Sequence, residues 1–147
     1  MKIKVFEKPE IKEIEVVINC QEKNEQVTQI KNALTYLNKS ITGKLNGKTY
    51  QLPPNKIYYF ESIDNRVYAY TKVDVFQVAL KLYQLEDILA NTPYIRINKN
   101  TILNTRKIKT FHMSINGRMK ATLVNQEKVV ISRKYVPVLR HKLGGKR

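Results

Sequence analysis

The stretch IYYFESIDNRVYAYT, residues 57–71, indicates the fold most clearly. Two runs rich in β-branched and aromatic residues, Ile57–Ser62 and Arg66–Thr71, flank the turn residues Asp64 and Asn65. Such runs on either side of a short polar turn are typical of a β-hairpin. We therefore expect a mainly β fold that includes this hairpin.

Short strands and polar turns continue on both sides of this stretch. Upstream, Asn46-Gly47 separates Ile41–Leu45 from Lys48–Leu52, and this pair favours the positive φ angles of a type I′ turn. Downstream, Asn116-Gly117 predicts another hairpin. The other strands that we expect are Val75–Ala79, Tyr94–Ile97, Ile102–Asn104, Ile108–Ile115, Met119–Val124 and Lys128–Ile131. Many short strands with polar turns predict a small β-sandwich or an open barrel.

Helical spacing occurs in only two places within this β-rich region. Leu82, Leu85 and Leu89 predict a short helix near residues 82–90, which ends before Pro93. The tail Val136–Leu143 predicts a C-terminal helix, in which a proline is tolerated in the first turn.

The first 40 residues predict a strand-helix extension of the main fold. Ile14, Val16 and Ile18 alternate with other residues, as in a strand with one buried face. Further apolar residues then fall three or four positions apart on one side of a helix: Val27, Ile30, Leu34 and Leu37. We expect this stripe to pack on the main domain, with a role in joining two subunits as the alternative. The expected division is an accessory segment at residues 1–40 and a main domain at residues 42–147.

Positive charge is concentrated in the main domain. The chain has a net charge of +15, with 27 basic and 12 acidic side chains. Residues 1–41 hold seven basic and six acidic side chains, whereas residues 42–147 hold 20 and six, a net of +14. A block of this charge attracts a polyanion, so nucleic acid is the leading partner and an anionic membrane surface is the second.

The sequence gives little support to catalysis, and we expect no enzyme activity, no metal and no cofactor. Two histidines and the single Cys20 are too few for a Cys/His zinc site, and no phosphate-binding or dinucleotide-binding glycine motif occurs. The lone cysteine favours a reducing compartment. No apolar run approaches the roughly 20 residues that span a bilayer. We therefore expect a cytoplasmic protein.

Three motifs follow one another along the chain: the strand and turn at residues 57–67, the segment Tyr94–Asn104 and the closing segment Val129–Tyr135. Their residues and their order resemble the LytTR family of bacterial DNA-binding domains. The similarity spans about residues 42–143. It implies a mostly β fold of three short sheets with little helix, whose loops enter successive major grooves of duplex DNA.

The resemblance also identifies candidate DNA-binding residues, all of them in or next to the connections at the ends of expected strands. They are Asn65, Arg66, Asn98, Lys99, Asn100, Arg133 and Lys134. An amide side chain can pair bidentately with adenine, and arginine or lysine can reach guanine or grip phosphate. Arg96 lies within a strand pattern, so we expect that it supports the adjoining loop.

The resemblance further implies direct-repeat DNA sites that are bound by two subunits. Many family members carry a receiver domain, whereas this chain is expected to be a stand-alone regulator. Similar short members often accompany a small membrane protein that restrains them, so such a partner is also expected. The alternative function is RNA binding, with Tyr58, Tyr59, Tyr68 and Tyr70 stacking on bases if they are exposed. Their place in strand patterns favours packing within the sheet.

Overall fold

A computed structural model describes residues 1–144 of the chain. Strands and short helices alternate along it, and the main-domain elements lie within a residue or two of the expected positions. The elements are α1 (Glu25–Leu37), β1 (Ile41–Leu45), β2 (Lys48–Leu52), η1 (Pro54–Lys56), β3 (Ile57–Ile63), β4 (Arg66–Thr71), β5 (Val75–Val78), α2 (Leu82–Ile88), β6 (Tyr94–Asn98), β7 (Thr101–Asn104), η2 (Thr105–Lys107), β8 (Ile108–Met113), β9 (Met119–Leu123), β10 (Lys128–Ile131), η3 (Arg133–Tyr135) and α3 (Val136–Lys142). The mainly β fold class is confirmed. The final three residues of the expected main domain, 145–147, lie outside the described residues.

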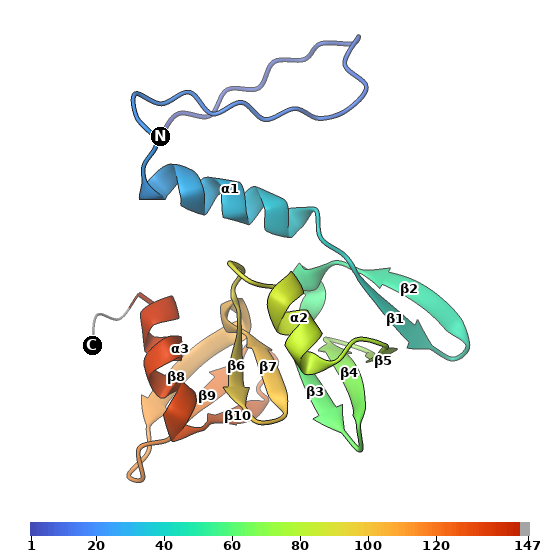
Figure 1. Cartoon of the computed structure of the whole chain (residues 1–147), viewed down its shortest axis with the longest axis vertical. Coiled ribbons are helices and arrows are strands. Elements are labelled where there is room, and N and C mark those ends of the chain that lie inside the picture. Colours follow the sequence, from blue (N-terminus) through green and yellow to red (C-terminus); the bar gives the residue numbers. More distant parts are fainter. Residues whose placement is uncertain (145–147) are drawn as a thin grey trace.

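The strands form two antiparallel sheets instead of the three that the resemblance implies. One sheet has seven strands in the order β2-β1-β5-β4-β3-β7-β6, and the other has three in the order β10-β9-β8 (Figure 1). The larger sheet is continuous because β3 pairs with β7, and because β1 pairs with β5 at Lys44 and Gln77. Strands that are close in sequence therefore join more distant strands in one hydrogen-bonded layer.

The two faces of the large sheet contribute to separate hydrophobic cores. One core surrounds Phe60, Leu85 and Ile102, and it includes side chains of α2. The other surrounds Leu103, Leu123 and Leu139, and it joins β7 to the small sheet and to α3. All six of these side chains are at most 1% exposed. Burial on both faces of the large sheet makes its central strands a rigid support for the loops at their ends.

Two of the hairpin turns have the conformation that their sequences predict. The φ angles are 51° and 77° at Asn46 and Gly47, and 50° and 65° at Asp64 and Asn65. Paired positive φ angles are those of a type I′ turn. The third hairpin differs because its loop is longer, and Ser114 N–H donates to the carbonyl of Arg118 across it. In each case asparagine, aspartate or glycine occupies the left-handed backbone region at low steric cost.

The N-terminal extension differs from the expectation. The predicted strand around Ile14–Ile18 is wrong, because residues 1–24 form no strand or helix and Ile14 is 92% exposed. A strand needs a hydrogen-bonding partner, and no described residue of this chain supplies one there. The two limbs of the segment run back and forth on the side of α1 that faces away from the main domain (Figure 1).

The helix α1 docks on the domain through a different face from the one that we expected. Tyr36 is buried in the first core, where its ring lies 6.4 Å from that of Tyr94. The helix has about 3.6 residues per turn, so Tyr36, nine positions after Val27, lies on nearly the opposite side of the helix from it. The apolar stripe is therefore not the docking face, and Leu37 remains 64% exposed.

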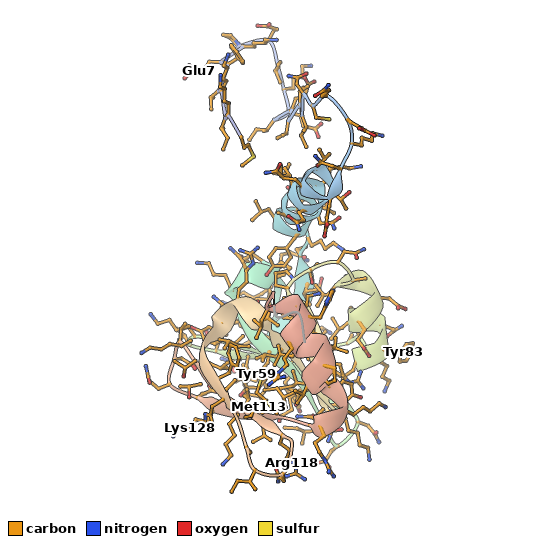
Figure 2. The ribbon with its side chains drawn as sticks, turned by 90° about the vertical axis from the view of Figure 1, so that its left-hand side faces the viewer. Glu7, Tyr59, Tyr83, Met113, Arg118 and Lys128 are labelled. Atoms are coloured by element: carbon orange, nitrogen blue, oxygen red, sulfur yellow. The ribbon has the colours of Figure 1, made fainter. Side chains whose placement is uncertain are left out.

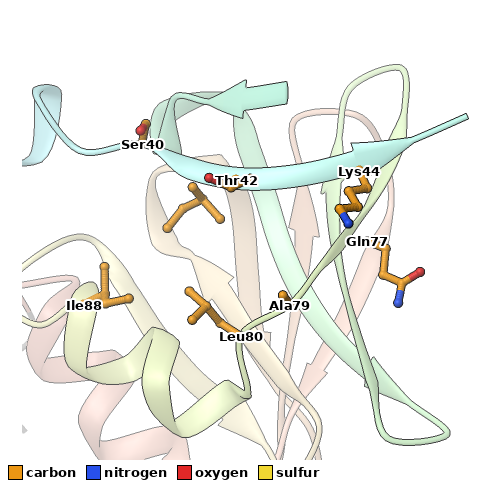
Figure 3. Close-up of a pocket in the computed structure, with 8 residues that line it drawn as sticks. Ser40, Thr42, Lys44, Gln77, Ala79, Leu80 and Ile88 are labelled. Atoms are coloured by element: carbon orange, nitrogen blue, oxygen red, sulfur yellow. The ribbon is translucent and has the colours of Figure 1, made fainter. Parts of the chain in front are cut away.

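An open pocket of about 520 Å³ lies where β1 diverges from the segment that leads into α2 (Figure 3). Its lining is largely apolar and includes Ile41, Ala79, Leu80 and Ile88, with Lys44 at one side.

Among residues 1–144, no helix is long and apolar enough to cross a bilayer.

Candidate nucleic-acid interface

The first candidate loop is the β3–β4 turn. Asn65 and Arg66 are both exposed, and Asn65 has a φ of 65°. The backbone of Asn65 thus shapes the turn, while no hydrogen bond holds its side-chain amide within the described chain. Asn65 can therefore serve as a turn former and still present an amide to a base edge.

The second loop joins β6 to β7, and its own side chains organise it. Asn98 is half-buried and accepts a 2.8 Å hydrogen bond from the backbone N–H of Asn100 through its side-chain Oδ1. This bond leaves Asn98 partly committed to loop structure. Lys99 and Asn100 are exposed, so their side chains are the ones that the loop offers to a partner.

Arg96, in strand β6, stabilises this second loop by hydrogen bonds to its backbone, as its place in the strand predicts. Its Nε donates to the carbonyl of Asn98 and its Nη2 donates to the carbonyl of Lys99, both at 3.1 Å. Its Nη1 forms an ion pair with Glu86 of α2. Three of the guanidinium's donors are therefore used within the protein, which makes Arg96 a positioning residue for the loop.

The third loop is the 3-10 turn η3, which follows the last strand. Arg133 and Lys134 are both exposed there. The Lys134 ammonium lies 5.4 Å from the centre of the Tyr135 ring, a cation–π distance that restrains this otherwise flexible side chain. A positive charge held at a fixed place suits contact with phosphate.

Two backbone hydrogen bonds join these three loops into one edge. Ser62 N–H donates to the carbonyl of Asn100 at 2.8 Å, which links the end of β3 to the β6–β7 loop. Ser132 N–H donates to the carbonyl of Ile97 at 2.9 Å, which links the end of β10 to β6. We call the surface formed by the seven candidate residues the loop edge. It lies at the end of the domain opposite α1 (Figure 1).

The sequence analysis missed a fourth loop at this edge, the β8–β9 hairpin. A Cβ added to Gly117 would stand 2.7 Å from Cδ of Arg133, so the hairpin lies against the Arg133 side chain. Arg118 follows this turn, is exposed and lies at the same lower end of the molecule (Figure 2). One local signal was present, because Arg118 follows an Asn-Gly turn as Arg66 follows Asp64-Asn65, but the sequence does not show that this turn lies beside Arg133.

The tyrosines that were candidates for stacking on RNA bases pack within the sheet instead. Tyr58 is buried, and the rings of Tyr59 and Tyr70 stack with centroids 4.4 Å apart. The Tyr59 hydroxyl donates to Glu127 and the Tyr70 hydroxyl donates to Glu61. Burial, together with the bond to Glu61, raises the pKa of Tyr70 to about 12. The preference for packing over base stacking is confirmed for these three side chains.

Residues 1–144 contain no group of three or more histidine, cysteine, aspartate or glutamate side chains that could hold a metal ion. His112 and His141 are both exposed, on β8 and α3. The geometry thus defines a class of protein: a basic β domain that presents amide and cationic side chains from several loops on one edge. That arrangement is typical of nucleic-acid recognition.

The family follows from comparison with known proteins. The LytTr DNA-binding domain matches residues 47–144. This chain belongs to the LytTR family, and it is a DNA-binding transcriptional regulator. The family and the fold are those of DNA-binding regulators and not of enzymes, and the comparisons give no support to the RNA-binding alternative.

Relatives and a solved structure agree with this assignment. The chain is 28% identical over 145 residues to an uncharacterized HTH-type transcriptional regulator of Staphylococcus aureus strain MSSA476. That alignment covers 97% of this chain and 98% of the relative, and a relative from strain MW2 gives the same values. The structure resembles a LytTr DNA-binding domain from Bacillus cereus with a TM-score of 0.67 and 24% identity, over 71% of this chain and 96% of that one.

The fold itself differs from the helix-turn-helix type that those relatives' names suggest. Within residues 1–144, no two α-helices are consecutive, because five strands separate α1 from α2 and five separate α2 from α3. Recognition by one helix in a groove is therefore not the geometry that this domain offers. Its exposed polar groups are carried by loops instead.

Proposed function

We propose that the protein reads a specific duplex sequence through the loop edge, with its loops in the major groove. One observation carries this proposal: the loops that hold all the candidate residues are joined by the Ser62–Asn100 and Ser132–Ile97 hydrogen bonds. Residues distant in sequence thereby become one rigid surface within a domain of net charge +14. Pre-organised donors lose little conformational entropy on binding.

Roles can be assigned within this surface from the chemistry of each side chain. Asn65 and Asn100 carry no charge, so their contribution is hydrogen bonding to base edges. Arg66 and Arg133 can read guanine or hold phosphate. Lys99 and Lys134, together with Arg118, supply positive charge that fixes the register of the domain on the duplex. Asn98 contributes mainly by shaping its loop.

We further infer that two subunits bind direct-repeat sites, and that the protein works in the bacterial cytoplasm, where it meets chromosomal DNA. The family resemblance supports both statements. It also supports regulation by a small membrane protein that restrains the regulator. These three proposals are more specific than DNA binding, and any of them could be wrong while the protein still binds DNA.

The test is selection of bound sequences from a random duplex pool at about 0.15 M salt. We expect enrichment of a defined motif, and enrichment of two copies in the same orientation if direct repeats are used. If no sequence is enriched and binding depends on salt concentration but not on DNA sequence, the proposal of specific reading is overturned. The protein would then be a nonspecific binder of polyanions. Inverted motifs would overturn the direct-repeat proposal alone.

A further inference from the structure

The N-terminal segment exposes apolar side chains that no described part of the chain covers. Ile3, Val5, Ile14 and Val16 are between 59% and 92% exposed. Scattered single apolar residues on a surface are ordinary, but a run of them in one segment marks an interaction surface. The question is what covers this segment.

The segment folds back on itself at a turn, although its two limbs form no strand pairing. Ile11 N–H donates to the carbonyl of Lys8 at 3.0 Å, which closes a turn with Pro9 at its second position. The limbs on either side run in opposite directions (Figure 1). Counting outward from the turn in antiparallel register, Val5 faces Ile14 and Ile3 faces Val16. In that register the same face also holds Glu7 and Lys12, and the other face holds Phe6 and Val17, so both faces carry exposed apolar side chains.

Charges along the limbs are complementary in the same register. Lys4 falls opposite Glu15, and Glu7 falls opposite Lys12. Opposite charges on facing positions stabilise strand pairing, whereas like charges oppose it. Opposite charges lie on facing positions whether a limb pairs with the other limb of its own copy or with that limb of a second copy.

The helix α1 adds a second unpartnered surface next to this hairpin. Its docking side chain, Tyr36, points into the domain, while the stripe that includes Ile30 and Leu34 lies on another side and is only half-buried. Leu37, on the same stripe, is 64% exposed. Exposed or half-buried apolar side chains are therefore present both in the hairpin limbs and along the helix.

We propose that the exposed apolar side chains of residues 1–37 form a dimerisation surface and that its occupant is the same segment of a second copy of this chain. Charge favours this partner. Residues 1–41 have a net charge of only +1, so two copies meet without repulsion, whereas two domains of +14 repel each other. An anionic lipid surface requires an excess of positive charge, which this segment lacks.

The relatives are consistent with a defined role for this segment. Their alignment covers 97% of this chain and 98% of theirs, although the DNA-binding domain match begins only at residue 47. A segment of this length upstream of the domain is therefore shared. The short link Asn38–Ser40 between α1 and β1 then joins the paired segments to two separate DNA-reading domains.

The test is sedimentation velocity of the full chain without DNA, at about 50 μM protein. We expect a species of twice 17.2 kDa. The double substitution Ile14→Glu with Val16→Glu should raise the dissociation constant of the dimer at least about a hundredfold. The reason is that two aliphatic side chains in each subunit, four in the dimer, would be buried at the interface and become carboxylates. The matched control is Val73→Glu, since Val73 is 82% exposed in the β4–β5 turn, and it should stay dimeric.

A second readout uses Cys20, which is exposed and is the only cysteine in the chain. A spin label there should give a defined distance between two copies in the wild type and in Val73→Glu, and none in the double variant. Circular dichroism should show that all three proteins are folded, because the substituted side chains are exposed.

Two outcomes would overturn the proposal. One is a monomeric wild type, and the other is a dimer that the double substitution leaves intact. Flotation of a monomeric wild type with anionic vesicles, lost in the double variant, would identify a lipid surface as the occupant instead. Because no DNA is present, these outcomes are independent of the proposed DNA-reading function.

Discussion

The substitution Asn65→Gly tests most directly whether the loop edge reads bases. Asn65 has a φ of 65°, so alanine there would add backbone strain of about 1–2 kcal/mol. A loss of affinity could then come from a destabilised turn as well as from the lost amide. Glycine adopts this φ without penalty and removes only the amide. If the amide makes a bidentate base contact, its loss should weaken specific binding by about 1–3 kcal/mol, or roughly 5- to 150-fold.

The assay is fluorescence anisotropy with a selected duplex and with a scrambled duplex of equal length, each over a series of salt concentrations. Asn65→Gly should weaken binding to the selected duplex alone and leave the salt dependence unchanged, because no charge is lost. The matched control is Asn46→Gly. Asn46 also has a positive φ, 51°, but it lies in the β1–β2 turn and not on the loop edge. Urea denaturation should give similar stabilities for both variants and the wild type.

One result would refute the reasoning. If Asn65→Gly is as stable as the control and still discriminates the selected duplex as the wild type does, Asn65 shapes its turn and does not read DNA. Equal losses on the selected and scrambled duplexes would also contradict base reading, since they would indicate a general loss of grip.

Other predictions concern phosphate contacts, the loop support and the junction with α1. If about six phosphates are neutralised, log K against log salt should have a slope near −5, and Arg133→Ala or Arg118→Ala should each reduce its magnitude by about one; a slope near zero would remove the electrostatic argument. Arg96→Met keeps an aliphatic side chain but removes the bonds to the β6–β7 loop, so specific affinity should fall about tenfold with the fold intact in circular dichroism, and unchanged affinity would show that the loop is ordered without it. Tyr36→Ala should lower the free energy of unfolding by about 3 kcal/mol in urea titrations, whereas Val73→Ala, in the exposed β4–β5 turn, should change it by less than about 0.5 kcal/mol; equal effects would contradict docking through Tyr36.

The domain boundary stays a prediction, and the structure adds a condition to it. Residues 42–147 hold the candidate loops, but Tyr36 and Ile41 are both buried in the first core. A fragment that starts at residue 42 therefore loses part of that core. We expect such a fragment to be less stable than one that begins before α1, with its DNA preference retained wherever it is folded.

Much of the candidate site could be predicted because its signals are local. The turn at Asp64 and Asn65 is determined by which residues tolerate positive φ, and the support role of Arg96 follows from its place next to a loop. Arg118 was not predicted, because nothing in the sequence shows that its hairpin lies against Arg133, 15 positions later. The commitment of Asn98 to its own loop is likewise visible only in the hydrogen bond to Asn100.

The sequence alone determined those features of this protein that depend on near neighbours: the hairpin turns, the short helices, the basic domain and the motif order of its family. These depend on backbone preferences and on side chains a few positions apart, which the sequence states directly. Only the tertiary structure decided how strands join into two sheets, which side of α1 docks, and that the predicted strand at Ile14–Ile18 does not form. It also decided that residues as distant as Ser62 and Asn100, or Ile97 and Ser132, hold one edge together. Strand pairing and helix docking depend on which surfaces are left to be buried once the whole chain has folded, and no local pattern contains that information.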